Sequence, residues 1–482
     1  MPSTILNDLP PEHVGDRLEE RVRAAVLASR RKVVALDDDP TGVQTVHDTA
    51  VLTTWETPDL ATELRRSHPV FFLLTNSRSL PTAEAAALNR TIASRLQEAE
   101  VLARAVEPDA TAGFVLASRS DSTLRGHYPA ETDALAEVLG TVDGVLLAPA
   151  FFEGGRYTIN DVHYVRDGER LVPAAETEFA KDATFGYTHS DLPHWVEEKT
   201  GGRIPAADVG SLSIATIREG GPERVAAQLM EVSRGQPVVV NAASYADLSV
   251  VVLGLLRAEA AGKRFVYRTG ASFVRARAGL PAPPLLTRDD LLGSNAPPAL
   301  PGLVVVGSHV RRSGEQLMRC LELPGVVGIE LSVPEVLGDG MTGDREVERV
   351  GAAAADALRS GRTPVVYTSR RVEQASEGDQ LVISRRVSAA LVAIVQRLEE
   401  RPGFVIGKGG ITSSDVGTQG LGARRAVVLG QIRPGVPVWR LGPETRFPGL
   451  PYVVFPGNVG DPETLAEVVT LLRGRAFSVG RL

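Results

Sequence analysis

The sequence predicts an α/β fold made of two three-layer domains with mostly parallel sheets, and three observations carry this prediction. Short apolar runs recur along the chain, and longer helical segments separate them. Such continuous apolar runs are typical of strands that are buried on both faces of a parallel sheet. A proline-rich stretch from Gly279 to Gly302 interrupts the pattern, and a second series of strands and helices follows it.

The first half of the chain begins with a charged amphipathic helix, expected at residues 14–31, and continues with buried strands. The strand runs are Lys32–Leu36, Val70–Leu74, Gly113–Ala117, Gly144–Ala148, Pro237–Val240 and Arg264–Tyr267. The helical segments between them, such as Thr82–Glu100 and Pro222–Arg234, are long enough for the right-handed crossovers that join parallel strands. We therefore expect an N-terminal domain at residues 1–285.

The proline content of the stretch from Gly279 to Gly302 is typical of an interdomain linker. Beyond it, the expected strands are Leu303–Val306, Val326–Glu330, Pro364–Tyr367, Gly403–Ile406, Ala426–Leu429, Pro437–Arg440 and Tyr452–Phe455. This second series predicts a C-terminal domain at residues 300–482.

The overall composition argues against several classes of protein. Lys and Arg total 52 and Asp and Glu total 59, so the net charge is −7, which disfavours the basic surface that nucleic acid binding needs. The single cysteine, Cys320, cannot form an internal disulfide and is expected to be a small buried side chain. The N-terminus has no apolar signal segment, and the most apolar stretch, Leu248–Leu256, is too short to span a membrane. We therefore expect a cytoplasmic protein without nucleic acid or membrane partners.

Polar and charged side chains follow each of the first four predicted strands. These segments are Asp37–Gly42, Thr75–Ser79, Ser118–His127 and Pro149–Arg156. In α/β sheets, ligand-binding groups gather where strands end and loops begin. Arginine, asparagine and serine can hold a carboxylate, and aspartate accepts hydrogen bonds from hydroxyls. The set therefore suits a polyhydroxylated carboxylic acid.

Each segment also has a plainer explanation when it is taken alone. Asp37–Asp39 could form a solvated turn or a helix N-cap. Arg78, Arg119 and Arg125 could be ordinary surface charges, and His127 alone is more often a hydrogen-bonded structural histidine. The convergence of these groups at successive strand ends favours a binding site.

A glycine-rich loop follows one strand of the second half, in the segment Gly407–Asp415. Glycines allow the backbone to approach a ligand, Thr and Ser can cap a following helix, and a helix N-terminus can bind phosphate. The spacing matches neither a Walker A loop nor G-x-G-x-x-G, so a structural glycine turn stays the alternative. Gly307–His309 and Pro456–Asp461 follow two further strands, and the three loops could line one nucleotide pocket.

Together these motifs resemble those of the four-carbon acid sugar kinase family, which includes the D-threonate and D-erythronate kinases. The D-D-x-T-G signature of that family appears as Asp38–Gly42, and its K-x-D-S-T-L-R-G signature appears as Arg119–Gly126, with Arg in place of Lys. The second half matches a G-S pair at Gly307–Ser308, a G-G-x-T-S loop at Gly409–Ser413 and a G-N-x-G segment at Gly457–Gly460. The chain departs from the commonest pattern at Pro40, Arg119, His309–Val310 and Ile411, which resembles a longer branch of the family.

The resemblance implies an ATP-dependent kinase that phosphorylates a hydroxyl of a small sugar acid, similar to threonate or erythronate or a related oxo or branched acid. The N-terminal domain would bind the acid and the C-terminal domain the nucleotide, with Mg²⁺ bridging the phosphates. Asp38 or Asp39 would orient, and could deprotonate, the acceptor hydroxyl. The residues expected to bind the acid are Asn76, Ser77, Arg78, Arg119, Asp121, Ser122 and Arg125. The residues expected to bind ATP are Ser308, Gly409, Gly410, Ile411, Thr412, Ser413, Gly457, Asn458 and Gly460.

Two other functions stay open at this point. A catalytically silent sensor would bind the same sugar acid and ATP without transferring phosphate. A hydroxy-acid dehydrogenase is disfavoured, because no dinucleotide fingerprint follows the first strand. The sequence leaves open which acid is bound, which groups hold the metal, and whether the chain forms a homodimer.

Overall fold

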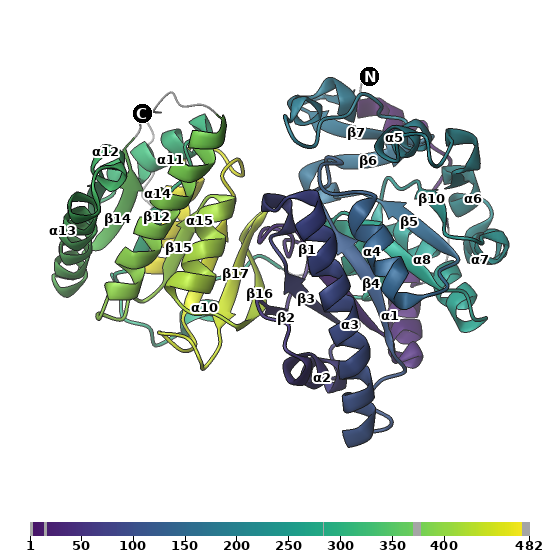
Figure 1. Ribbon diagram of the computed structural model, residues 1–482, viewed down its shortest axis with the longest axis horizontal. Helices are drawn as coiled ribbons and strands as arrows, with labels where there is room; N and C mark the ends of the chain where they lie inside the picture. Colours follow the sequence, from purple (N-terminus) through teal and green to yellow (C-terminus); the bar gives the residue numbers. More distant parts are fainter. Residues whose placement is uncertain (1–2, 14–16, 283, 370–376, 475–482) are drawn as a thin grey trace. The chain divides into compact units, whose positions relative to one another are not determined.

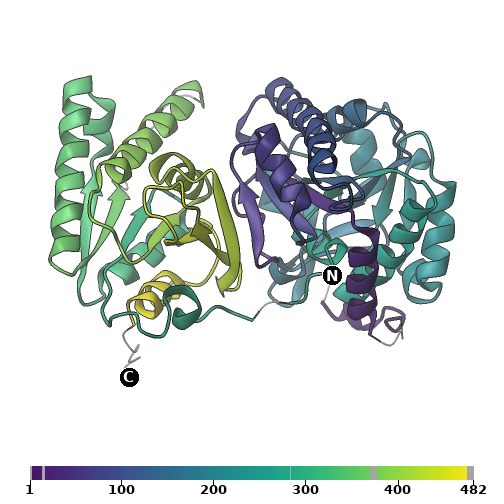
Figure 2. The same ribbon diagram turned by 90° about the horizontal axis from the view of Figure 1, so that it is seen from below.

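The computed structural model describes residues 3–13, 17–282, 284–369 and 377–474 of the chain. These residues form two compact units, Met1–Ala282 (unit 1) and Pro283–Leu482 (unit 2). Within each unit, helices cover both faces of a mostly parallel sheet (Figures 1 and 2). The predicted fold class, two three-layer α/β domains, is therefore confirmed.

The main sheet of unit 1 consists of short, apolar and mostly buried strands. They are β1 (Lys32–Asp37), β2 (Thr49–Leu52), β3 (Val70–Leu74), β4 (Phe114–Arg119), β5 (Gly144–Ala148), β9 (Gly210–Leu212), β10 (Gln236–Val240) and β11 (Phe265–Thr269). Their order is β2-β3-β1-β4-β11-β5-β10-β9, and neighbouring strands are parallel. The predicted runs coincide with these strands within one or two residues, whereas β2 and β9 were not predicted.

Helices pack against both faces of this sheet. They are α1 (Leu18–Ser29), α2 (Thr57–Arg65), α3 (Thr82–Val106), α4 (Ala130–Leu139), α5 (Leu192–Lys199), α6 (Ile214–Arg218), α7 (Gly221–Glu231), α8 (Tyr245–Ala260) and α9 (Ala271–Arg277). Leu60, Ile92 and Leu135 of α2, α3 and α4 belong to the same buried apolar cluster as Val34 and Leu116 of β1 and β4. Helices α1, α7, α8 and α9 contact one another on the opposite face. Short 3₁₀-helices lie at Ser3–Asn7, Ser77–Ser79, Phe152–Gly154, Ala174–Glu176, Glu178–Lys181 and Ala206–Asp208.

A small antiparallel sheet follows β5 and was not predicted. Its strands are β6 (Arg156–Ile159), β7 (Val162–Asp167) and β8 (Arg170–Pro173). Each strand is short and mixes charged and apolar residues, so the sequence contains no continuous apolar run to signal it. Val165 of β7 packs into a buried cluster with Tyr128 and Trp195, which joins this sheet to the rest of unit 1.

The sheet of unit 2 is parallel over most of its width and ends in an antiparallel hairpin. Its strands are β12 (Leu303–Val306), β13 (Val326–Leu331), β14 (Thr363–Thr368), β15 (Val405–Lys408), β16 (Arg425–Arg433), β17 (Val436–Leu441) and β18 (Pro451–Phe455). The order is β13-β14-β12-β15-β18-β17-β16, and only the pairings of β17 within this described sheet are antiparallel. Strand β15 lies two residues later than predicted, so Lys408 belongs to the strand and not to the glycine-rich loop.

Helices also cover both faces of the unit 2 sheet. They are α10 (Arg288–Leu292), α11 (Arg311–Leu321), α12 (Val333–Leu337), α13 (Gly340–Arg359), α14 (Glu377–Arg397), α15 (Gly410–Asp415) and α16 (Thr464–Arg473), with a π-helical turn at Val416–Gly420 after α15. Leu317 and Cys320 of α11 and Leu465 of α16 pack with Val304 and Val306 of β12. Cys320 is fully buried, as the sequence predicts.

Most of the expected linker is a folded part of unit 2. Thr287 and Asp290 cap helix α10 reciprocally, and Leu291 is buried in the unit 2 core. The backbone N–H of Leu286 donates to the carbonyl of Gln431 at 2.7 Å. The proline content suggested an extended linker, but Leu286, Leu291 and Leu292 between the prolines pack with the unit 2 core. The division between the two units therefore lies at Ala282.

Candidate functional site

The carboxyl ends of β1, β3 and β4, which are neighbours in the sheet, bring three of the four predicted polar segments of unit 1 together. Asp37 at the end of β1 is in register with Leu74 at the end of β3 and with Arg119 at the end of β4. Arg119 is in register with Thr269 at the end of β11. Because parallel strands end at the same edge of a sheet, the segments that follow β1, β3 and β4 share one edge.

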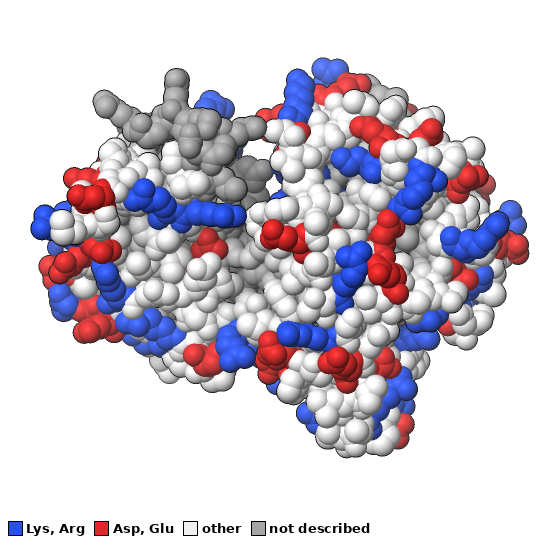
Figure 3. Space-filling view, in the orientation of Figure 1, with Lys and Arg blue, Asp and Glu red and all other residues white. Residues whose placement is uncertain are grey.

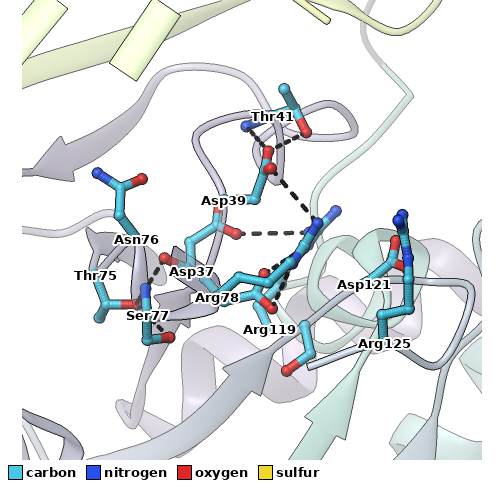
Figure 4. A network of polar contacts seen from close by, with 12 residues as sticks. Asp37, Asp39, Thr41, Thr75, Asn76, Ser77, Arg78, Arg119, Asp121 and Arg125 are labelled. Atoms are coloured by element: carbon cyan, nitrogen blue, oxygen red, sulfur yellow. Dashed lines mark hydrogen bonds and ion pairs between the residues drawn. The ribbon is translucent and has the colours of Figure 1, made fainter. Parts of the chain in front are cut away.

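Arg78 is held between Asp38 and Asp39, and Figure 4 shows Arg78 beside Asp39. Its Nη2 and Nε donate to the two carboxylate oxygens of Asp38 at 2.6 and 3.1 Å, and its Nη1 lies 3.5 Å from Asp39 Oδ2. The backbone N–H of Thr41 donates to Asp39 Oδ1 at 2.8 Å. The side chain of Asp38 is 3% exposed and that of Asp39 is 23% exposed, so a ligand reaches Asp39 more easily.

Asp37 and Arg119 form a second, fully buried ion pair, with 3.5 Å between Asp37 Oδ1 and Arg119 Nη1. Within the described residues, neither carboxylate oxygen of Asp37 accepts a hydrogen bond. A Cβ on Gly42 would overlap this carboxylate, so glycine is required where the loop closes over Asp37. Burial raises the pKa of Asp37 well above its ordinary value. The positive charge of Arg119 lowers this pKa, and the negative charges of Asp38 and Asp39 raise it further.

Asp121 and Arg125 form a third pair at the same edge. Arg125 Nε donates to Asp121 Oδ2 at 2.6 Å, and Thr123 donates its hydroxyl to the same oxygen. Burial opposes ionisation of Asp121, but the charges of Arg78 and Arg125 and these two hydrogen bonds outweigh it and lower the pKa of Asp121. Asp121 is therefore a carboxylate at neutral pH.

Arg268 of β11 is a buried residue of the site that the sequence analysis missed. Its Nη1 and Nη2 donate to the backbone carbonyls of Asp121 and Arg125 at 3.2 and 2.9 Å. The side chain therefore holds the loop that carries both residues. An arginine near the end of an apolar run was the available signal, but the predicted strand ended at Tyr267.

Glu131 of α4 was also missed, and it determines where Ser77 points. Ser77 Oγ donates to Glu131 Oε1 at 2.5 Å, and Asn89 Nδ2 donates to the same oxygen at 3.3 Å. Burial, with a contribution from Asp38, raises the pKa of Glu131 to about 7. The hydroxyl of Ser77 is therefore engaged inside the protein.

The remaining predicted residues of unit 1 lie at the same edge but differ in exposure. Asn76 has a left-handed backbone with φ 51° and is partly exposed. Ser122 is buried, and its carbonyl accepts a hydrogen bond from His163 Nε2 at 2.7 Å. His127 contacts the carbonyl of Ser77 at 3.0 Å and the Thr82 hydroxyl at 3.1 Å, which is the structural role expected for it.

This edge of the unit 1 sheet therefore carries a small set of partly exposed charged side chains, and buried charged groups such as the Asp37–Arg119 ion pair lie beneath them. Asp39, Arg78 and Arg125 have side chains that are 23%, 20% and 25% exposed. The buried neighbours restrict their positions before any ligand binds. Such an arrangement can accept a hydrogen bond from a hydroxyl at Asp39 and donate charged hydrogen bonds to an anion from the two arginines.

The three predicted loops of unit 2 also share one edge. Strands β12, β15 and β18 are adjacent and parallel, with Val306 in register with Lys408 and Lys408 with Phe455. A Cβ on Gly409 would lie 3.0 Å from Ser308 Cβ, and one on Gly457 would lie 2.9 Å from Ser308 Oγ. Ser308 therefore lies between the two glycine loops, and both glycines are needed for that close approach.

The start of α15 differs from the expectation in one respect. Gly409 is the N-cap residue, with φ 117° and no capping side chain, and the helix begins at Gly410. Thr412 and Ser413 lie within the helix, and Ser413 Oγ donates to the carbonyl of Gly410 at 3.0 Å, so neither residue caps it. The side chain of Ile411 is exposed, and Asn458 and Gly460 lie exposed in the loop after β18.

The described residues contain neither a metal-binding cluster nor a membrane-spanning helix. No group of three or more His, Cys, Asp or Glu side chains in the described ranges could hold a metal ion. Within the same ranges, no helix combines the length and the apolar character needed to cross a bilayer.

Comparisons with known proteins agree with the division into two units. Residues 33–277 match the model of a sugar-binding N-terminal domain, and residues 303–465 match that of a nucleotide-binding C-terminal domain. The chain is 28% identical to a D-threonate kinase of Bordetella bronchiseptica over 430 residues, which are 87% of this chain and 90% of that protein.

Two solved structures share the fold of the chain. A Salmonella typhimurium LT2 protein has a TM-score of 0.64 at 20% identity, covering 91% of this chain and 98% of its own. A Haemophilus influenzae protein has a TM-score of 0.61 at 19% identity, covering 91% of this chain and all of its own. Because the two domain models follow one another over most of the sequence, the chain belongs to the four-carbon acid sugar kinase family.

Proposed function

We propose that this protein is an ATP-dependent kinase that phosphorylates a hydroxyl group of a small sugar acid, similar to threonate or erythronate or a related oxo or branched acid. The observation that carries the proposal is the set of partly exposed charges, Asp39, Arg78 and Arg125, at the strand ends of a domain matched by a sugar-binding model. A sugar acid offers both a carboxylate for arginines and hydroxyls for an aspartate. The identity with a D-threonate kinase supports the same substrate class.

In this proposal, Asp39 orients and deprotonates the acceptor hydroxyl. Asp38 is less suited to that role because its side chain is only 3% exposed, compared with 23% for Asp39, and both of its carboxylate oxygens accept hydrogen bonds from Arg78. Arg78 and Arg125 would bind the substrate carboxylate through the N–H groups that their aspartate partners leave available. Arg119, Asp121 and Ser122 would support these groups from behind, since each is largely buried.

The fit of a nucleotide to unit 2 is supported by the glycines at the strand ends. A Cβ added at Gly409 or at Gly457 would lie too close to Ser308, so these two glycines keep the backbone accessible to a ligand. Gly409 also has a φ of 117°. Ser308, Gly409–Ser413 and Gly457–Gly460 would surround the phosphates of ATP. Mg²⁺ would neutralise phosphate charge and take most of its ligands from phosphate oxygens and water, as this ion commonly does.

The test is an ATP-turnover assay of the full chain against a panel of four-carbon sugar acids, with the matching neutral polyols as controls. We expect ADP formation and a phosphorylated product with at least one acid. A neutral polyol should be a poor acceptor, because a lost hydrogen bond to a charged group costs about 1.5–3 kcal/mol, roughly a tenfold or larger loss in kcat/KM.

Each result of this assay separates the proposal from its alternatives. Binding of acid and ATP without turnover would identify a sensor. Equal phosphorylation of an acid and its matching polyol would show that the arginines do not recognise the substrate carboxylate. Reduction of a nicotinamide cofactor by a hydroxy acid would instead identify a dehydrogenase.

A further inference from the structure

Lys408 is a buried lysine at the carboxyl end of β15, beside the glycine loops of unit 2. Its side chain is fully buried, and its Nζ donates to the carbonyls of Pro456 and Gly457 at 2.5 and 3.1 Å. The Nζ atom lies 4.3 Å from the centre of the Phe455 ring. The carbonyl of Gly457 also accepts a hydrogen bond from Ser313 Oγ at 2.8 Å. Lys408 and Ser313 therefore both hold the loop that faces Ser308.

In the part of the chain that the structure describes, Lys408 has no counter-charge of the kind that a buried ammonium group ordinarily has. Within the described residues, no carboxylate forms an ion pair with it, and the charge that acts on it is the cation of Arg312 on α11. Neutral carbonyls satisfy the N–H groups but do not offset the cost of burying the charge. An anion bound beside the loop would supply that charge.

The other titratable groups on the elements around Lys408 have partners of their own. Asp461, after β18, accepts from Thr464 Oγ1 at 2.7 Å, and Glu315 of α11 lies 3.8 Å from Arg312. Asp415 of α15 accepts from Ser388, and the hydroxyl of Tyr452 in β18 donates to the carbonyl of Ser413 at 2.5 Å.

We propose that Lys408 is the buried partner of the nucleotide phosphates and takes up a proton when they bind. The inference rests on the proposed function, because it requires the nucleotide to occupy the loops of unit 2. Lys408 would then be neutral in much of the free protein at and above neutral pH. In the complex it would be an ammonium that neutralises phosphate charge and holds the Pro456–Gly457 segment in place.

Electrostatics agrees with this assignment. Burial, followed by the charge of Arg312, lowers the pKa of Lys408 to about 7 in the free protein. Phosphate charge acts in the opposite direction and favours the ammonium. At pH 8, a group with a pKa of about 7 is about one-tenth protonated, so complete protonation on binding takes up about 0.9 proton.

The experiment is a calorimetric titration of the full chain with Mg²⁺-ATP at pH 8, without sugar acid, in buffers of different ionisation enthalpy. The terminal phosphate is already ionised at this pH, since its second pKa is about 6. The dependence of the observed heat on the buffer gives the number of protons taken up. We expect about 0.9 proton per nucleotide for the wild type and none for Lys408→Met, with weaker binding. Lys408→Arg should bind without uptake, because a guanidinium stays charged.

Lys32 supplies a matched control in unit 1. It is also buried, its Nζ donates to the carbonyls of Arg66 and His68, and burial lowers its pKa to about 8. Lys32→Met should therefore leave the uptake of protons on nucleotide binding unchanged.

The outcomes distinguish this inference from the proposed function. Absence of nucleotide binding by the wild type would overturn the nucleotide site itself. Binding without proton uptake, or equal uptake in the wild type and Lys408→Arg, would overturn the role of Lys408 and leave the nucleotide site standing. The arginine variant keeps the test available if Lys408→Met does not fold, which thermal unfolding would reveal.

Discussion

At the scale of single residues, the two aspartates of the D-D-x-T-G motif have different surroundings. Both oxygens of Asp38 are bound by Arg78, whereas Asp39 shares its carboxylate with Thr41 and keeps 23% of its side chain exposed. Adjacent residues of the same type are therefore suited to different roles, one to holding an arginine and one to meeting the substrate.

We predict that Asp39→Asn lowers kcat by about 10²–10⁴-fold, which is the usual contribution of a positioned acid–base group. Binding of ATP should be unchanged, and steady-state kinetics with calorimetry measures both quantities. Asp38→Asn is the contrasting variant, because it weakens a charged hydrogen bond to Arg78 and should cost about 1.5–3 kcal/mol in free energy of unfolding. Wild-type turnover in Asp39→Asn would exclude this residue as the base.

Glu131 makes the stability of unit 1 dependent on pH. Burial raises its pKa from the ordinary 4.5 to about 7, so between these values the native state holds more protons than the unfolded state. The free energy of unfolding therefore falls as the pH rises through this window. The full effect of about 2.5 pKa units corresponds to about 3 kcal/mol.

We predict that Glu131→Gln removes this contribution and still accepts the hydrogen bonds from Ser77 and Asn89. Relative to the wild type, the variant should gain up to about 3 kcal/mol in free energy of unfolding between pH 4.5 and pH 8. Denaturant unfolding at several pH values measures it, with the exposed Glu137→Gln on the same helix as the control. A parallel pH dependence in wild type and Glu131→Gln would contradict the prediction.

At the scale of secondary-structure elements, the turn from β15 to α15 depends on one glycine. Gly409 has φ 117°, which side chains rarely adopt, while Gly410 is the first residue of the helix. The sequence motif alone does not tell which of the two adjacent glycines, Gly409 or Gly410, has the positive φ. The structure places the positive φ at Gly409, because β15 continues through Lys408 and the chain must turn directly after it.

We predict that Gly409→Ala costs about 1–3 kcal/mol in the free energy of unfolding of unit 2, the usual cost of such a backbone conformation. The added Cβ would also lie 3.0 Å from Ser308 Cβ, so binding of ATP should weaken at least tenfold while binding of the sugar acid is unaffected. Gly410→Ala is the matched control and should have the smaller effect on both. Calorimetry with each ligand checks this, and unchanged ATP binding in Gly409→Ala would place the phosphates elsewhere.

At the scale of the whole molecule, the two units have separate cores and can be separated at one point of the chain. Leu286 and Leu291 pack within unit 2, so a cut at Leu286 would damage that unit, whereas a cut after Ala282 would not. On the face shown in Figure 3, positive and negative side chains are interspersed, as the nearly balanced composition suggests.

We predict that residues 1–282 fold alone and bind the sugar acid without ATP, because the unit contains a complete main sheet with helices on both faces. Circular dichroism and calorimetry on the isolated segment measure both properties. A cut at residue 300 should yield a less stable second unit, since it removes α10 from the core. A folded segment 1–282 without affinity for any acid that the full chain binds would show that unit 2 contributes to the acid site.

The sequence by itself determined the fold class, the positions of the long parallel strands and the edges at which polar residues gather. These features depend on local patterns, namely continuous apolar runs and the residues that follow them, and such patterns can be recognised in the sequence itself. It also determined the family, because the motifs at Asp38–Gly42 and Gly409–Ser413 lie within short segments.

Only the tertiary structure decided which of these residues are accessible and which are engaged with each other. The pairing of Arg78 with Asp38 and the burial of Arg268 and Glu131 depend on residues that are far apart in the sequence. So does the environment of Lys408, which forms no ion pair with a carboxylate of the described residues. The same holds for Leu286, Leu291 and Leu292 of the expected linker, which pack into unit 2. Such contacts depend on how strands are ordered in the sheet, and that order follows from the packing of the complete chain and not from any local pattern.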